Sequence, residues 1–195
     1  NSGQAALPRG GIVHRLDKDT TGLMVVAKTL TAHTDLVNQL QAREVHRQYA
    51  AVVQGWVTSG GEVNAAIGRH PVNRKKMAVV DHGGKAALTH YRIDQRFAHH
   101  TLLRIDLETG RTHQIRVHMS HRGHPLIGDP VYGGRPRIPP GADDELIAAI
   151  RGFSRQALHA RALELRHPSS GDLISWEVEP PADFSGLLAV LTRYD

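Results

Sequence analysis

The chain alternates between short apolar segments and polar turns, and the spacing of its apolar residues predicts more strands than helices. Apolar residues at every second position, as in Leu103, Ile105 and Leu107, are typical of a strand with one buried face. This pattern, together with short apolar runs bounded by turn residues, predicts strands at residues 12–13, 23–27, 48–56, 62–67, 77–80, 86–94, 101–108, 157–166 and 173–179. A polar loop over residues 14–22 separates the first two strands.

Helices are predicted at four places along the chain. Their ranges are 31–43, 112–122, 143–151 and 183–194. Thr29 or Thr31 suits the N-cap of the first helix, and Gly123 suits the end of the second. Because the helices interrupt the strands without regular alternation, we expect an α+β domain with a mixed, largely antiparallel sheet. A doubly wound nucleotide-binding fold would require that alternation.

Length and composition restrict the class of protein further. The 195 residues suit one compact domain. The longest apolar runs, such as Leu23 to Ala27, have five residues, too few for a membrane-spanning helix. Asn1 to Gln4 carry neither the basic nor the apolar part of a secretory signal. The absence of cysteine excludes disulfides and thiolate chemistry. We therefore expect a soluble, cytoplasmic monomer.

The charge of the chain suggests a polyanionic partner. Lys and Arg total 24 against 19 Asp and Glu, and most of the excess lies in the first two-thirds of the chain. Arg strongly outnumbers Lys, which suits forked recognition of phosphates, although an Arg-rich proteome would give the same bias. Neither a P-loop nor a G-x-G-x-x-G motif is present, so ATP and NAD chemistry have no support and no cofactor is expected.

The polar loop at residues 14–22 is the first candidate for chemistry. If its backbone is extended, Arg15 and Asp17 lie on one face, with His14 and Leu16 on the other. A guanidinium beside Asp17 would keep its carboxylate ionised, as a nucleophile or base requires. The alternative is that Asp17 only caps backbone N–H groups in a turn.

The second candidate is the basic segment at residues 109–124, which holds three Arg and four His. Such a segment suits phosphate contacts, whereas a merely solvated helix face would not explain its interleaved apolar residues. His118, His121 and His124, followed by Asp129, allow a metal site to be considered. No recognised metal-ligand spacing is present, so we expect no metal.

Two isolated residues have ordinary structural explanations. Tyr49 lies in a predicted strand of small and branched apolar residues, where a half-buried Tyr is common. Asp129 lies in Gly128-Asp-Pro-Val-Tyr-Gly133 and is most simply a turn residue.

Five segments together resemble the Rlu-type (RluA/RluD family) pseudouridine synthases of large-subunit ribosomal RNA. The segments are 11–27 with its His-Arg-Leu-Asp-Lys-Asp-Thr-Thr-Gly core, 47–49, 110–118, 124–133 and 156–160. The five segments occur in the family's order. Their residues are most similar to those of the family member that acts on the helix 69 stem-loop. The resemblance implies the pseudouridine synthase fold and conversion of specific uridines in that RNA without a cofactor.

The resemblance also implies roles for single residues. It makes Asp17 the catalytic carboxylate and Arg116 the cation that pairs with it. Tyr49 stacks on the uracil and takes part in removing the C5 proton, and Ile115 contacts the other side of the base. Arg15 enters the RNA stack when the target nucleotide flips out.

The basic segment supplies further predicted contacts with RNA. Arg111, His113 and Arg122 are predicted to bind it. We expect four guanidinium groups to face phosphates on one side of the molecule, namely those of Arg15, Arg111, Arg116 and Arg122.

The chain departs from the family pattern at its start, because only sixteen residues precede Asp17. Family members normally carry an earlier motif with a Lys-Pro pair, and often an S4-like RNA-binding domain before it. We therefore expect residues 1–195 to be an N-terminally truncated catalytic domain. A catalytically silent RNA-binding domain of the same fold and a His-dependent metal hydrolase remain the alternatives.

Overall fold

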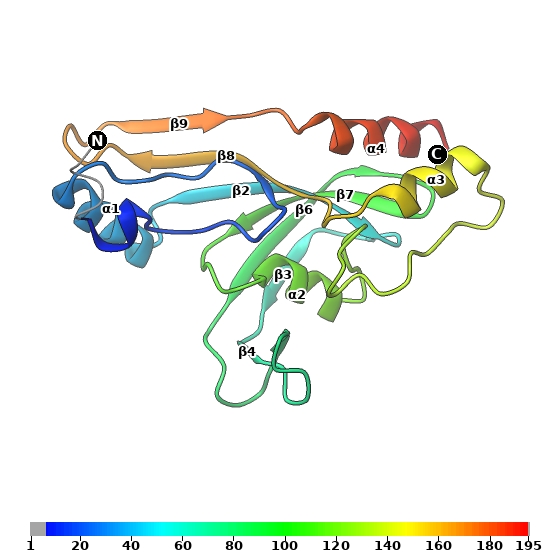
Figure 1. The fold of residues 1–195 in the computed structure, drawn as a ribbon, viewed down its shortest axis with the longest axis horizontal. Helices are drawn as coiled ribbons and strands as arrows, with labels where there is room; N and C mark the ends of the chain where they lie inside the picture. The colour runs from blue at the N-terminus through cyan, green and yellow to red at the C-terminus, as the bar shows by residue number, and fades with distance from the viewer. Residues whose placement is uncertain (1–6, 195) are drawn as a thin grey trace.

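The structure, a computed structural model, describes residues 7–194 and has a sheet with helices on both faces (Figure 1). The helices are the 3-10 helix η2 (Pro8–Gly11), α1 (Leu30–Ala42), α2 (Gln114–His121), α3 (Asp144–Gly152) and α4 (Ala182–Arg193). The strands are β1 (Thr21–Gly22), β2 (His46–Gln54), β3 (Gly61–Asn64), β4 (Ile67–Arg69), β5 (Met77–Val79), β6 (Leu88–Arg96), β7 (His100–Leu107), β8 (Leu158–Arg166) and β9 (Leu173–Glu177).

The main sheet is mixed but largely antiparallel. Its strand order is β1-β8-β2-β7-β6-β3, and only the short pairing of β1 with β8 is parallel. β9 pairs with β8 beyond the two residues that β1 occupies. β4 and β5 form a separate two-stranded sheet that projects below the main sheet (Figure 1). The predicted fold class is therefore confirmed.

Strand β2 crosses the middle of the sheet and is buried on both faces. Tyr49, Ala51 and Val53 belong to the apolar cluster that includes residues of α2. Ala50 and Val52, at the alternate positions, belong to the cluster formed with α3 and α4. Because side chains of a strand alternate between faces, one continuous apolar run supplies both cores. Figure 1 shows α2 on one side of the sheet and α4 on the other.

Helix α1 packs on a third apolar cluster at the end of the sheet. Leu36 of α1 is buried there beside Leu163 and Leu165 of β8. The Oγ1 atom of Thr29 accepts a hydrogen bond from the N–H of Ala32, so Thr29 is the N-cap. The side-chain amide of Gln39 bonds the backbone N–H and C=O of Arg166, which ties α1 to β8.

Most predicted elements are confirmed, and three are corrected. The strand predicted at 12–13 is wrong, because Ile12 makes only an isolated bridge there. All four helices form within two residues of their predicted ranges, and Gly123 follows α2 with φ +81°. The strand predicted at 23–27 is wrong: that segment makes only an isolated bridge from Val26 to Ile12. The regular pairing of β1 with β8 ends at Gly22, because the chain leaves the edge of β8 there. The strand predicted at 62–67 is divided between β3 and β4, which pair with different partners.

In residues 7–194 no helix is both long enough and apolar enough to cross a membrane.

The close pairing of Gly22 with Ala160 predicts a steric requirement for glycine. Gly22 has φ +111°, and an added Cβ would lie 2.1 Å from the carbonyl oxygen of Ala160. We expect Gly22→Ala to lower the free energy of unfolding by about 2 kcal/mol or more, because strain and a backbone clash add. Urea denaturation measures this change.

Gly134→Ala is the matched control, since Gly134 also has positive φ but open space around its Cβ position. Gly134→Ala should lower the free energy of unfolding by about 1 kcal/mol, because it adds backbone strain without a steric clash. Equal costs for the two variants would contradict the steric explanation.

Candidate active site

A cavity of about 600 Å³ lies where the N-terminal loop, α1, the start of β2 and the loop before α2 meet. Leu16, Tyr49, Ile115 and Leu158 provide apolar walls. The charged residues that line the cavity are Arg9, Arg15, Asp17, Arg43, Arg47, Glu108 and Arg111. Five guanidinium groups therefore face two carboxylates, which favours an anionic ligand.

Asp17 lies in a loop that is held from two directions. Its backbone C=O accepts a hydrogen bond from the N–H of Thr20 at 3.0 Å. The side-chain amide of Gln156 donates to the carbonyl of Lys18 at 2.6 Å and to Oγ1 of Thr20 at 2.9 Å. The Asp17 carboxylate accepts from Arg116 and, among residues 7–194, from no backbone N–H. The carboxylate therefore does not cap backbone N–H groups of the turn, which was the alternative role of Asp17.

Arg116 is a buried cation shared by two carboxylates. Its Nε and Nη2 donate to Asp129 at 2.7 and 2.9 Å, and its Nη1 donates to Asp17 at 3.3 Å. The side chains of Arg116, Asp129 and Asp17 are 4%, 0% and 16% exposed. The ring of Tyr132 lies against the guanidinium, with 5.1 Å from Cζ to the ring centroid. Asp129 thus binds two of the guanidinium nitrogens of Arg116, and Asp17 binds the third.

Electrostatics agrees with this geometry. Burial acts to lower the pKa of Arg116, but the hydrogen bonds and charges of Asp129 and Asp17 outweigh it and raise that pKa. Burial likewise acts to raise the pKa of Asp129, and donation from Arg116 and from the N–H of Tyr132 reverses this and lowers it. Arg116 and Asp129 are therefore both held in their charged, hydrogen-bonded forms.

Tyr49 and Ile115 reach the same cavity from different elements. Tyr49 comes from β2 and Ile115 from the first turn of α2, and both are less than a tenth exposed. Burial raises the pKa of the Tyr49 hydroxyl, while the charge of Arg47 opposes the shift and that of Asp17 adds to it. A flat group in the cavity would have an aromatic ring and an aliphatic side chain within reach.

Buried hydrogen bonds of Gln114 hold α2 against the sheet. Its Oε1 accepts from the hydroxyl of Thr109 and the N–H of Arg111, and its Nε2 donates to the carbonyl of Leu88 and to Thr89 Oγ1. Both ends of the amide are satisfied, so the loop before α2 and strand β6 are fixed to the helix that carries Ile115 and Arg116. Gln114 is not among the residues for which the sequence predicts a role.

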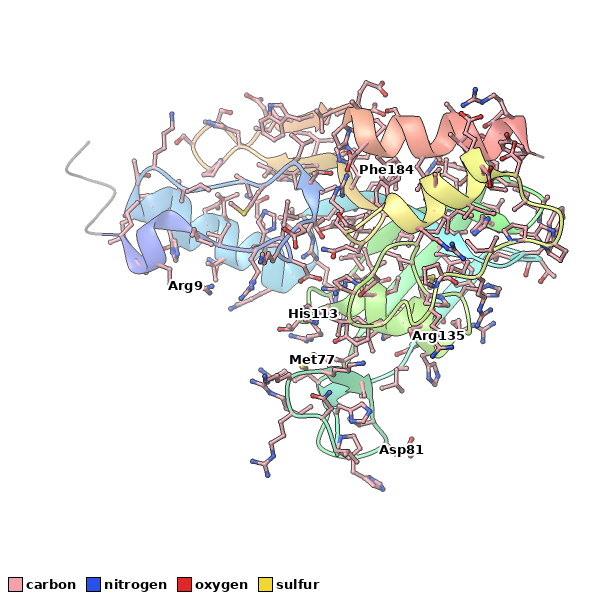
Figure 2. The ribbon with its side chains drawn as sticks, turned by 45° about the vertical axis from the view of Figure 1, so that its right-hand side comes forward. Arg9, Met77, Asp81, His113, Arg135 and Phe184 are labelled. Carbon is pink, nitrogen blue, oxygen red and sulfur yellow. The ribbon has the colours of Figure 1, made fainter. Side chains whose placement is uncertain are left out.

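The other predicted RNA-binding residues occupy different places. Arg15 and Arg111 line the cavity, and both are exposed. His113 is the N-cap residue of α2, with φ +58°, and its Nδ1 lies 2.8 Å from the Tyr132 hydroxyl. Figure 2 shows His113 near Met77 of the projecting β4–β5 hairpin. Arg122 is exposed at the opposite end of α2 and does not line the cavity.

One part of the predicted phosphate-facing set is corrected. Arg116 was expected to face phosphates together with Arg15, Arg111 and Arg122. Its guanidinium is buried and already bonded to two carboxylates, so it has no exposed edge for a phosphate. Arg116 belongs to the interior of the site.

The His residues considered as metal ligands make separate contacts. His118 is buried between Thr89 Oγ1 and the carbonyl of Ala65, at 2.8 and 3.0 Å. His124 Nδ1 lies 3.0 Å from the carbonyl of Gln54, and His121 is exposed. Across residues 7–194 no three His, Asp or Glu side chains gather as a metal-binding group.

Sequence reasoning missed two residues of the site. Asp129 does make a turn, since its Oδ1 accepts from the N–H groups of Val131 and Tyr132, but it also holds Arg116. Arg47 belongs to the motif at residues 47–49 and has no predicted role of its own, yet it is buried and lines the cavity. The sequence signal for Arg47 was a charged residue two positions before Tyr49 in a strand, which places both on one face.

Comparison with known proteins gives consistent matches. A family model described as RNA pseudouridylate synthase matches residues 4–121. The chain is 65% identical over 97% of its length to "Ribosomal large subunit pseudouridine synthase D" of Pseudomonas aeruginosa, and covers 59% of that protein. It is 59% identical over 96% of its length to the protein of the same name from Escherichia coli, and covers 57% of it. The chain thus spans somewhat more than half of these relatives.

Two solved structures have a similar fold. "Human RNA Pseudouridylate Synthase Domain Containing 4" matches with a TM-score of 0.74 and 25% identity, over 93% of this chain and 75% of that one. "Human RNA Pseudouridylate Synthase Domain Containing 1" matches with a TM-score of 0.68 and 26% identity, over 87% and 68% of the two chains.

The buried pair of Arg116 and Asp129 predicts a large loss of stability when one partner is neutralised. We expect Asp129→Asn to lower the free energy of unfolding by about 3–5 kcal/mol, because a buried guanidinium loses its bidentate acceptor. Glu145→Gln is the control, since Glu145 and Arg193 pair at 2.6 Å with side chains 51% and 59% exposed. That change should cost about 1 kcal/mol or less. Similar losses in both variants would contradict the special position of Asp129.

A buried acceptor nitrogen predicts that stability depends on pH. His14 Nε2 accepts the N–H of Val25 at 3.1 Å, and burial, reinforced by the charge of Arg47, lowers the pKa of His14 to about 4. The unfolded chain takes up this proton near pH 6.5, and the folded chain does so only near pH 4. The free energy of unfolding should therefore fall as the pH is lowered through this window.

Urea denaturation between about pH 7 and about pH 5 measures the slope. His14→Gln should make the slope smaller without abolishing it, because burial also lowers the pKa of His100 to about 4. His82→Gln, in an exposed turn, is the control. An unchanged slope in His14→Gln would count against the assignment.

Proposed function

The chain belongs to the RNA pseudouridylate synthase family, and on that premise we propose that it converts uridines of large-subunit ribosomal RNA into pseudouridine. The observation that carries the proposal is the carboxylate of Asp17, bonded to buried Arg116 in a cavity with an excess of guanidinium groups. The names of the bacterial relatives support the choice of RNA. Within this RNA we propose the helix 69 stem-loop as the target, because the residues of the motifs are most similar to those of the family member that acts there.

The reaction exchanges one bond of the nucleotide for another. The N1–C1′ bond of the uridine breaks, the uracil turns, and its C5 atom bonds to C1′. The proton on C5 is lost and N1 gains one, so the product is an isomer of the substrate. This chemistry needs neither a redox cofactor nor ATP, and we assign the single ionised carboxylate that it does need to Asp17.

Arg116 is assigned the task of holding that carboxylate ionised and in place. With Nε and Nη2 committed to Asp129, only the Nη1 edge is directed at Asp17. This leaves the second oxygen of Asp17 for the substrate. Preorganised charge of this kind does not have to reorient during the reaction.

Tyr49 and Ile115 are assigned to the two faces of the uracil, with Tyr49 also taking part in removal of the C5 proton. Both line the cavity together with Asp17. Arg15, exposed at the rim, is assigned to the space that the target nucleotide leaves when it flips out. Base flipping costs on the order of a few kcal/mol and less in a loop, which favours a stem-loop substrate.

Asp17→Asn tests the proposal directly. The amide keeps the size of the side chain and removes its negative charge, so we expect turnover to fall by about 10²- to 10⁴-fold or more. Release of tritium from C5-labelled uridine in ribosomal RNA measures turnover, and filter binding measures affinity. The affinity for RNA should hold or improve slightly, because a negative charge near phosphates has gone.

Asp19→Asn is the matched control. Asp19 lies in the same loop, is exposed and has φ +67°, a conformation that Asn also adopts readily. It should release tritium at the parental rate. Near-parental release by folded Asp17→Asn protein would exclude both the mechanism and this site.

A further inference from the structure

Arg47 is a buried cation without a carboxylate partner. The residue is 8% exposed, and among residues 7–194 no Asp or Glu oxygen lies within 4 Å of its guanidinium. Its Nη2 makes two long contacts, 3.3 Å to the carbonyl of Leu107 and 3.4 Å to that of Glu108. Its Nε is buried without a hydrogen-bond partner. An unsatisfied buried charge costs stability, so its presence requires an explanation.

The guanidinium of Arg47 is directed at the cavity and closely fitted there. Arg47 and Tyr49 stand two positions apart on β2, and both line the cavity that holds Asp17. A Cβ added to Gly110 would lie 2.8 Å from Nη1 of Arg47, so glycine at this position leaves space for that nitrogen where it lies.

The charge of Arg47 affects the groups around it. Burial lowers the pKa of Arg47 itself, as expected for a cation with no acid beside it. The same charge adds to burial in lowering the pKa of His14, and it opposes burial at the Tyr49 hydroxyl. Arg47 therefore places a positive charge beside Tyr49, where the Asp17 carboxylate acts in the opposite direction.

The proposed reaction produces an anion at this depth. When the N1–C1′ bond breaks, its electron pair stays on the uracil, whose negative charge is shared among N1, O2 and O4. The electron-poor C1′ is quenched by bonding to the Asp17 carboxylate or by loss of a C2′ proton to it. In both routes the detached base is an anion until C5 bonds to C1′, and in the second route C2′ regains its proton from Asp17 as that bond forms. The proton on C5 then leaves and N1 gains one, which gives the neutral product.

We propose that Arg47 is the subsite for an anionic oxygen of the detached uracil and stabilises that base while it turns. This inference rests on the proposed function. Its forked N–H groups suit a planar group with two oxygens, and a donor already in place near a developing charge lowers the barrier without reorganisation. Bound uracil would supply the negative charge that the Arg47 guanidinium lacks.

A phosphate of the RNA backbone has the same charge and is the other source of such an oxygen. Phosphates stay outside on the nucleic acid backbone, where the exposed Arg15 and Arg111 lie at the cavity. Arg47 is buried beside Tyr49 instead. Its depth therefore favours the base, and the two sources predict different measurements.

Arg47→Met and Arg47→Gln test the proposal in single-turnover conversion of ribosomal RNA with enzyme in excess. We expect the rate to fall at least about 100-fold in both variants, as for loss of a preorganised donor. The Kd for RNA should stay within about twofold, with an unchanged salt dependence. Arg47→Lys should recover part of the rate because it keeps the charge. Arg151→Met, at an exposed position of α3, is the matched control and should behave as the parent.

Stability supplies an independent readout. Because removing an uncompensated buried charge relieves a cost, the Tm of Arg47→Met should equal or exceed that of the parent. Arg47→Gln retains an amide donor for the carbonyls of Leu107 and Glu108, and it serves if the Met variant does not fold. A residue with only a structural role would lower Tm and leave the rate at saturation unchanged.

The outcomes separate the hypotheses. A weaker Kd with a shallower salt slope and a parental rate at saturation would assign Arg47 to a phosphate and overturn the uracil subsite. Parental rate and Kd in both variants would overturn it as well, while the proposed function stands. A parent protein that forms no pseudouridine in ribosomal RNA would overturn both.

Discussion

The buried guanidinium of Arg116 connects the parts of this site that come from different segments of the chain. Asp129 binds two of its nitrogens and Asp17 the third, so the loop that carries Asp17 and the turn that carries Asp129 are oriented against one helix. That helix is in turn fixed by Gln114, whose amide bonds the loop before it and strand β6. A buried cation tolerates little displacement of its acceptors, because each lost bond leaves charge unpaired in a poorly solvated interior.

The two buried Arg residues of the site differ in how well they are satisfied. Arg116 has two carboxylates, and the combined effect raises its pKa despite burial. Arg47 has only distant carbonyls and an unpaired Nε, and burial lowers its pKa. A satisfied cation suits the task of positioning another residue. An unsatisfied cation in a cavity is suited to a ligand that arrives with the opposite charge, which is the role we propose for Arg47.

Periodicity predicted the elements well where one pattern extended over a whole element. The helix at α1 and the strands β2, β7 and β8 followed from apolar spacing and turn residues, and the mixed sheet followed from their order. The failure at residues 23–27 has a physical cause. Five consecutive apolar residues can form a buried strand, but here Leu23, Val25 and Ala27 pack against the cluster around α1 while the backbone leaves the sheet. Periodicity does not distinguish these cases.

The motifs by themselves predicted the family, and the family matches confirm that prediction. The same motifs brought Asp17, Tyr49, Ile115 and Arg116 into consideration as site residues. Only the tertiary structure shows that Asp129 and Arg47 belong to the site. From the sequence alone, Asp129 is interpreted as an ordinary turn residue and Arg47 as an ordinary charged residue in a strand. Burial and ion pairing depend on which distant groups the fold places alongside, and neither the 4% exposure of Arg116 nor the missing carboxylate at Arg47 has a local signature. Local spacing determines elements and motifs, whereas long-range packing determines which charges are paired.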